Sequence, residues 1–149
     1  MQVVLVCSSG GHLAQLYQLR PWWESHRRLW VTFGTTDATS LLADEEAVWA
    51  AHPTTRNLPN ALRNLRLAWS VLRSERPDVV VSDGAGVAVP FFVVAKLLGI
   101  STVFLEVVDR IETRTLTGRL LYPIADLVCV QWAEQMRLYP RAVEVGALL

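Results

Sequence analysis

The sequence has only two cysteines, no excess charge of either sign and no apolar run long enough to cross a membrane. Cys7 and Cys129 both lie in apolar segments, so we interpret them as reduced core residues rather than as a disulfide. The 14 basic and 14 acidic residues cancel, which argues against nucleic acid as a partner. A bilayer crossing needs about 18–20 apolar residues, and the start, MQVVLVC, lacks the features of a signal peptide. We therefore expect a cytoplasmic chain that can touch a membrane without crossing it.

The motifs of several common active sites are missing as well. There is no D-x-D, C-x-x-C, H-E-x-x-H or G-x-S-x-G, and the three histidines share no ligand spacing, so we predict no metal site. The dinucleotide fingerprint G-x-G-x-x-G and the P-loop signature are also absent. Asp37, shortly after the second predicted strand, leaves one opening for a stand-alone nucleotide-binding oxidoreductase, because an acid near that point can bind a ribose.

What the sequence does contain is a regular alternation of short apolar runs and longer helical stretches. Apolar runs without polar alternation are typical of strands covered on both faces, and strands that alternate with helices indicate a parallel sheet. We therefore predict an α/β fold, a Rossmann-like doubly wound parallel sheet, as one domain over residues 1–149. The predicted strands are residues 2–7, 28–33, 47–50, 78–82, 101–106, 127–131 and 142–145, and the predicted helices are residues 12–25, 38–46, 59–75, 87–98, 117–125 and 132–139.

Ligands of such sheets bind beyond the carboxyl ends of the strands, which directs attention to the loops at 8–12, 83–86 and 106–117. In the first loop, Gly10 and Gly11 favour a sharp turn before a helix, and a helix start of this kind suits a phosphate. The alternative is a tight turn without a ligand. His12 follows, and its imidazole can either take a proton from a sugar hydroxyl or merely cap the helix.

The other two loops carry acids. Asp83 precedes Gly84 and Gly86 in a second glycine turn, where it can orient His12, bind a sugar hydroxyl or only shape its own turn. Glu106 ends an apolar strand, so we expect it to point into the cleft. The charged run that follows it, which includes Arg110, is of a kind that usually forms a solvated surface.

Together these segments resemble one family of glycosyltransferase subunits. The sequence is similar to the membrane-associated, acceptor-side subunit of the split UDP-N-acetylglucosamine transferase of dolichol-linked oligosaccharide synthesis, and still more to its bacterial exopolysaccharide and capsule counterparts. A more distant resemblance is to the amino-terminal half of the lipid II-forming transferase of peptidoglycan synthesis. The resemblance covers nearly the whole chain and is weakest between Ala38 and Asn57. The matching segments are SSGGHL (8–13), DVVVSDG (78–84), LLGI (97–100), LE (105–106), RIE (110–112), LTGRLLYPIAD (116–126), VQW (130–132) and YP (139–140).

The resemblance implies the amino-terminal half of a GT-B glycosyltransferase, an inverting enzyme that uses a UDP-sugar. Its acceptor would be a lipid diphosphate-linked saccharide at the cytoplasmic face of the membrane, and the transferred sugar would be N-acetylglucosamine or a related hexose or uronic acid. The UDP-sugar would bind to a separate carboxy-terminal-half subunit, so we expect no cofactor on this chain and no activity without the partner. The alternative within this family is a non-catalytic anchor or activator of the donor-binding subunit.

The resemblance also implies roles for particular residues. The amides around Ser9, Gly10 and Gly11 would approach the diphosphate or the reacting sugar, and His12 would be the base. The remaining site residues would be Asp83, Gly84 and Gly86 in the second turn, Glu106 in contact with the acceptor or with His12, and Arg110 at the acceptor phosphate.

One further hypothesis concerns membrane contact. The helix predicted over 59–75 carries a basic stripe, and arginines near anionic lipid each contribute about 1 kcal/mol. The helix predicted over 87–98 supplies apolar candidates for the same contact, unless it is simply a core helix of the sheet. The residues proposed for the membrane face are Val87, Val89, Phe91, Phe92, Val94, Leu98, Trp22 and Trp23, with Arg63, Arg66 and Arg73 as the basic stripe.

Overall fold

In residues 1–148, which the computed structural model describes, seven short apolar segments form strands that all run parallel in one sheet. The order across the sheet is β3-β2-β1-β4-β5-β6-β7. The predicted Rossmann-like parallel sheet is confirmed, and each strand ends within one residue of its predicted bounds. The strands are β1 (Gln2–Val6), β2 (Arg27–Thr32), β3 (Ala47–Trp49), β4 (Val79–Ser82), β5 (Ser101–Leu105), β6 (Leu127–Val130) and β7 (Val143–Glu144).

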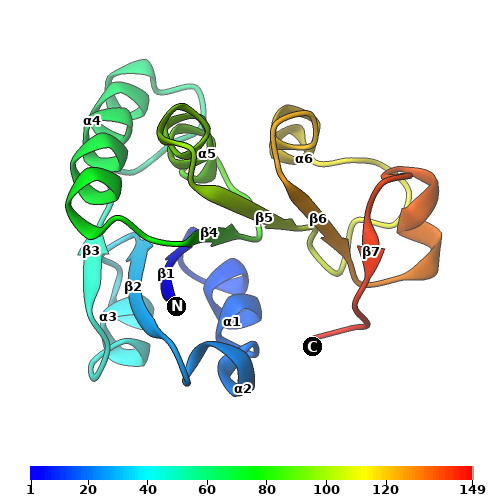
Figure 1. Ribbon diagram of the computed structural model, residues 1–149, viewed down its shortest axis with the longest axis horizontal. Helices are drawn as coiled ribbons and strands as arrows, with labels where there is room; N and C mark the ends of the chain where they lie inside the picture. Colours follow the sequence, from blue (N-terminus) through cyan, green and yellow to red (C-terminus); the bar gives the residue numbers. More distant parts are fainter. Residues whose placement is uncertain (149) are drawn as a thin grey trace.

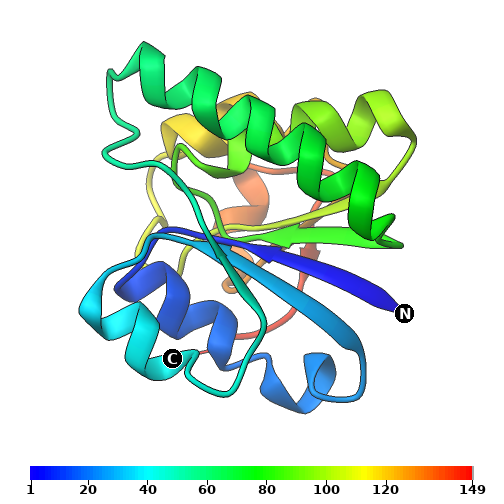
Figure 2. The same cartoon turned by 90° about the vertical axis from the view of Figure 1, so that its left-hand side faces the viewer.

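Helices cover both faces of this sheet, as Figure 1 and Figure 2 show. Because side chains alternate along a strand, each of the strands β1 to β6 contributes to a core on both faces, whereas both residues of the edge strand β7 are exposed. One core lies under α4, α5 and α6 and is built around Phe91, Phe92 and Phe104, and the other lies under α1, α2 and α3 around Trp23 and Trp30. The helices are α1 (Gly11–Tyr17), α2 (Arg20–Trp23), α3 (Thr36–Leu41), α4 (Leu58–Glu75), α5 (Ala88–Leu98), α6 (Leu116–Leu121) and the 3₁₀ helix η1 (Ala133–Arg137).

The single helix predicted over 12–25 is wrong in one respect, because the structure divides it into α1 and α2. Pro21 explains the break. Its nitrogen carries no hydrogen and cannot donate to the carbonyl of Tyr17, whereas proline is well suited to the first turn of a new helix. The interruption leaves α1 as a short helix whose first turn carries His12 and whose inward face carries Gln15.

The longest helix, α4, turns much of its apolar stripe outward. Its inward face instead includes Asn60 and Asn64, which hold the loop before the helix by bonding to backbone groups of Pro53 and Ala51. Of the leucines and the tryptophan that recur at helical spacing, Leu72 is buried in the core, whereas Leu62, Leu65 and Trp69 are exposed. The exposed apolar side chains of α4 are Leu58, Leu62, Leu65 and Trp69, and its exposed basic side chains include Arg63, Arg66 and Arg73.

The membrane hypothesis for the helix at 87–98 is wrong for most of its residues, because α5 is a core helix. Its strongly apolar sequence packs between the sheet and α4, where burial of each large side chain stabilises the fold by about 1.5–3 kcal/mol. Val89 and Leu98 are half-buried, and Trp22 is exposed. Within residues 1–148, no helix has both the length and the apolar character that a bilayer crossing requires. The proposed membrane residues that the structure buries are Val87, Phe91, Phe92, Val94 and Trp23.

The strand order places the two glycine turns side by side. The chain proceeds from β1 outward to β2 and β3, and then returns to add β4 on the other side of β1. Val6 of β1 pairs with Ser82 of β4, so the residues that follow them emerge together at the carboxyl edge of the sheet. This reversal of strand order is the switch point at which doubly wound sheets bind their ligands.

Candidate functional site

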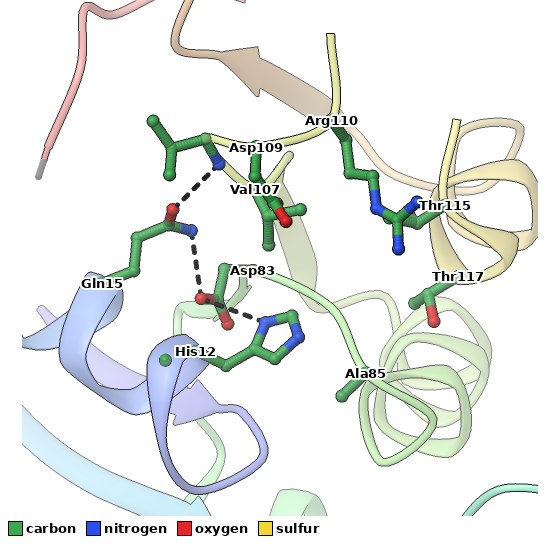
Figure 3. Close-up of a pocket in the computed structure, with 11 residues that line it drawn as sticks. His12, Gln15, Asp83, Ala85, Val107, Asp109, Arg110, Thr115 and Thr117 are labelled. Carbon is green, nitrogen blue, oxygen red and sulfur yellow. Dashed lines mark hydrogen bonds and ion pairs between the residues drawn. The ribbon is translucent and has the colours of Figure 1, made fainter. Parts of the chain in front are cut away.

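A cavity of about 420 Å³ opens at the switch point between the ends of β1 and β4 (Figure 3). Its floor comes from α1 and the turn after β4, and its far wall comes from the loop after β5 and the start of α6. Of the residues proposed from the sequence, the cavity brings together Gly11, His12, Asp83 and Arg110. The complete lining is Gly11, His12, Gln15, Asp83, Ala85, Val107, Val108, Asp109, Arg110, Thr115 and Thr117.

His12 and Asp83 form the central pair of this cavity. His12 Nδ1 lies 3.3 Å from Asp83 Oδ2, and the imidazole side chain is 30% exposed while the carboxylate is fully buried. An imidazole that turns Nδ1 toward a carboxylate carries its proton there, which leaves the lone pair of Nε2 available. The structure thus brings Asp83 beside His12, which is the placement that an orienting role of Asp83 requires.

The electrostatics of the pair suit proton transfer near neutral pH. Burial alone would lower the pKa of His12, but the contact with Asp83 and the charge of Asp109 outweigh it and raise the pKa. Burial raises the pKa of Asp83 to about 6, although the contacts with His12 and Gln15 oppose that rise. A base whose pKa lies near the working pH transfers protons most effectively.

The first glycine turn is held by an acid. Gly10 adopts a φ of 76°, and its N–H donates to Asp37 Oδ2 at 2.9 Å. That amide is therefore bonded within the chain, and Gly10 does not line the cavity. Ser9 does not line the cavity either, whereas Gly11 does. Asp37, the residue that left an opening for a dinucleotide, serves here to fix the turn.

The second glycine turn is conformationally strained and closely packed. Gly84 has a φ of 111° and the next residue, Ala85, has a φ of 62°, a region that costs a residue with a side chain of the order of 1–3 kcal/mol. A Cβ on Gly86 would lie 2.9 Å from Thr54 Oγ1, so glycine there lets the loop after β3 pack against the turn. Gly84 and Gly86 thus shape the cavity floor without lining it.

Glu106 is placed differently from its prediction. The expectation that it points into the cleft is wrong, because its carboxylate is 1% exposed and turns under α6. It accepts hydrogen bonds from the Tyr139 hydroxyl, from Thr115 Oγ1 and from the Val107 N–H at 3.0 Å. Burial raises its pKa, and these donors oppose the rise. A Cβ on Gly118 would collide with Tyr139 and Glu106, so the glycine makes room for this contact.

The wall of the cavity opposite His12 is formed by the charged loop after β5, a kind of segment that usually forms a solvated surface. Arg110 and Asp109 both line the cavity, and Figure 3 shows the Asp109 side chain extending toward His12 from the opposite wall. Gln15 and Thr117 were not proposed from the sequence. A polar residue at the inward position between Leu13 and Leu16 was the one available signal for Gln15. Residues 1–148 contain no group of three or more histidine, cysteine or acidic side chains that could hold a metal ion.

Comparisons of the structure identify the fold. The chain superposes on MurG from Acinetobacter baumannii with a TM-score of 0.74 and 20% identity, over 89% of this chain and 42% of that one. The match is to the N-terminal half of a GT-B glycosyltransferase, and it shows a common fold.

Sequence comparisons then identify the family. The family model described as "Oligosaccharide biosynthesis protein Alg14 like" matches residues 51–148, and the chain belongs to this family. The human UDP-N-acetylglucosamine transferase subunit ALG14 is 32% identical over 94 residues, which are 59% of this chain and 44% of the human protein.

A second relative is also named as an N-acetylglucosamine transferase. The UDP-N-acetylglucosamine--N-acetylmuramyl-(pentapeptide) pyrophosphoryl-undecaprenol N-acetylglucosamine transferase of Syntrophotalea carbinolica is 34% identical over 90 residues, 60% of this chain and 24% of that enzyme. The chain therefore spans less than half the length of these curated relatives. The resemblance seen in the sequence motifs is confirmed at the level of the family.

Proposed function

We propose that this chain is the acceptor-side part of a glycosyltransferase that moves a sugar from a UDP-sugar to a lipid diphosphate-linked saccharide. Membership of the Alg14-like family supports a role in oligosaccharide synthesis. The names of two relatives, a UDP-N-acetylglucosamine transferase subunit and a transferase acting on a pyrophosphoryl-undecaprenol acceptor, support the donor and acceptor classes. The observation that carries the proposal is the buried Asp83 carboxylate that orients His12 in a cavity at the switch point.

In the proposed reaction, His12 Nε2 accepts the proton of the acceptor hydroxyl while that oxygen attacks the anomeric carbon of the donor. The new C–O bond forms as the bond from that carbon to the UDP oxygen breaks, and UDP leaves with the bonding electrons. Attack opposite to the leaving group inverts the anomeric configuration. Asp83 stabilises the imidazolium that results, because the charge develops beside a buried carboxylate.

The donor is assigned to a separate subunit of the GT-B carboxy-terminal type, in agreement with the name "subunit" in the human relative. On this chain, Arg110 supplies a cation at the cavity wall for the acceptor diphosphate. Gly11 lies at the cavity floor, where its backbone can approach the reacting sugar. Glu106 is assigned to shaping the loop that carries Arg110, since its carboxylate is already occupied by Tyr139 and Thr115.

Replacing His12 by Ala tests this proposal in the chain reconstituted with its donor-binding partner. A catalytic base contributes about 10²–10⁴-fold, so transfer should fall by that factor. His26→Ala is the matched control, because His26 precedes β2 at the opposite edge of the sheet and packs edge-on against Trp22. Nearly full transfer by His12→Ala would instead favour the non-catalytic anchor.

Peripheral membrane contact is the second part of the proposal, and α4 supplies its surface. Leu58 is 72% exposed and Leu62 is 52% exposed, on the same helix as Arg63 and Arg66. Exposed apolar patches rimmed by basic residues favour an anionic lipid surface, where the apolar groups insert and the arginines pair with phosphates.

Co-sedimentation with vesicles of about 30% anionic lipid tests the surface, with neutral vesicles for comparison. Leu62→Glu should abolish sedimentation with anionic vesicles, because it places a like charge within the inserted patch. Val143→Glu is the control, since Val143 is an exposed apolar residue of the edge strand β7, away from α4. Equal binding by both variants would remove α4 as the contact surface.

A further inference from the structure

Behind His12 lie two buried glutamines, and the backbone fixes the orientation of the first. Gln15 is 2% exposed, and its Oε1 accepts hydrogen bonds from the Val108 N–H at 3.2 Å and from Gln131 Nε2 at 2.8 Å. Because a backbone N–H can only donate, the oxygen of Gln15 must face Val108. Its Nε2 is thereby turned toward Asp83, to which it donates at 3.1 Å.

The second glutamine is fixed in the same way. Gln131 is 1% exposed, and its Oε1 accepts the N–H of Leu148 at 2.9 Å. Its Nε2 donates to the Glu106 carbonyl at 3.0 Å as well as to Gln15. Three backbone groups, the N–H of Val108, the N–H of Leu148 and the carbonyl of Glu106, therefore determine the orientation of both side-chain amides. They belong to the segment at 146–148 and to the start of the loop after β5 that carries the charged wall of the cavity.

We propose that Gln15 and Gln131 are positioning residues for His12. The two glutamines keep the Asp83 carboxylate ionised and aligned with His12, and their own orientation is set by the loop after β5 and by residues 146–148. The inference rests on the proposed function only in taking His12 as the base. The physical reason is that a hydrogen bond to a buried carboxylate stabilises its charged form, and an ionised Asp83 keeps the proton of the neutral imidazole on Nδ1.

The other charges around the pair are few. Asp83 approaches His12 from the end of β4, and Asp109 and Arg110 face it from the loop after β5. Thr117 from α6 and Ala85 from the turn are uncharged. The thiol of Cys7 lies near Asp83, and burial raises its pKa, so it is neutral at the working pH. Gln15 is the neutral side chain within residues 1–148 that donates a hydrogen bond to Asp83.

A Gln15→Met variant tests the proposal, since methionine has a similar length and no amide. In the isolated chain, ¹³C NMR of the Asp83 carboxyl carbon should give a pKa above that of the parent, because the charged form has lost a donor. Gln131→Met should shift it in the same direction by less, and Gln18→Met, at the exposed end of α1, should leave it unchanged. An unchanged Asp83 pKa in folded Gln15→Met overturns the proposal, and if that variant does not fold, Gln131→Met decides in the same way.

The reconstituted enzyme gives a second readout that a merely structural role would not move. Gln15→Met should shift the acidic limb of the pH–rate profile to higher pH, and raising the pH should restore much of the lost rate. In the His12→Ala background the same substitution should have little further effect, because both act through one group. A pH-independent loss, or an equal loss in both backgrounds, contradicts the proposal. If the parent shows no transfer at all, the proposed function fails while the NMR titration still decides the positioning role.

Discussion

Asp83 and Glu106 are two buried carboxylates in equivalent places that serve different purposes. Each is the first residue after one of two adjacent parallel strands, β4 and β5, and each is 1% exposed. Asp83 is short, so it stays at the strand end and meets His12 and Gln15 from α1. Its Oδ1 has no hydrogen-bond partner within residues 1–148. Glu106 is one methylene longer and reaches under α6, where Tyr139 contacts it.

Under the proposed function, the difference separates two buried carboxylates at one sheet edge into one that assists His12 and one that holds the structure. Glu106 accepts hydrogen bonds at both oxygens, which favours a single fixed arrangement. Asp83 is bonded at one oxygen only and pairs with a group that can itself gain or lose a proton. A partly satisfied buried carboxylate beside an imidazole is the arrangement expected at a functional site.

The largest expected effect comes from removing the charge of each carboxylate in turn. Asp83→Asn should lower transfer by about 10²–10⁴-fold, because an amide nitrogen facing Nδ1 favours the tautomer whose Nε2 cannot accept a proton. Glu106→Gln should stay within about tenfold of the parent, since the base is unchanged. The measurement is kcat/KM of the reconstituted pair, and equal losses in the two variants would show that the carboxylates do not differ in role.

A smaller effect, on stability, should reverse the ranking of the two residues. Glu106→Ala leaves donors on Tyr139, Thr115 and Val107 without their acceptor, and each unpaired buried group costs about 1–3 kcal/mol. We expect the free energy of unfolding to fall by about 3–5 kcal/mol in urea titrations. Glu112→Ala, an exposed acid in the same loop, is the control. A loss below about 1 kcal/mol for Glu106→Ala would mean that water replaces the carboxylate.

The strands and the His12 turn could be predicted from the sequence because their signals are local. A continuous apolar run specifies a buried strand wherever it pairs, and Gly-Gly-His after such a run marks a strand-to-helix turn. The direction of Glu106 could not be predicted, since it depends on Gly118 leaving space under α6. The outward stripe of α4 was equally hidden, because the pattern of leucines does not show that Asn64 faces inward and bonds to the loop before the helix. The commitment of the Gly10 amide to Asp37 likewise requires the three-dimensional structure.

The smallest effect that separates the two carboxylates is the pH dependence of stability. The pKa of Asp83 is raised to about 6 in the folded chain, so its contribution to stability is fully present below pH about 4 and is lost as the pH rises through about 6. The pKa of His12 is also raised, and the stability that it contributes is likewise lost as the pH rises through its folded value. Asp83→Asn should therefore flatten the decline of unfolding free energy with pH.

A shift of about two pKa units corresponds to no more than about 3 kcal/mol, so Asp83→Asn should gain stability relative to the parent at pH 7.5 but not at pH 4. Thermal unfolding across this range is the measurement. Asp126→Asn is a control of opposite sign, because hydrogen bonds from the backbone and side chain of Thr102 lower the pKa of Asp126, and its contribution is lost as the pH falls. If Asp83→Asn lowers transfer and also stabilises the fold at neutral pH, the charge of Asp83 serves the proposed chemistry at the expense of stability. An Asn variant less stable than the parent at pH 7.5 would contradict this assignment.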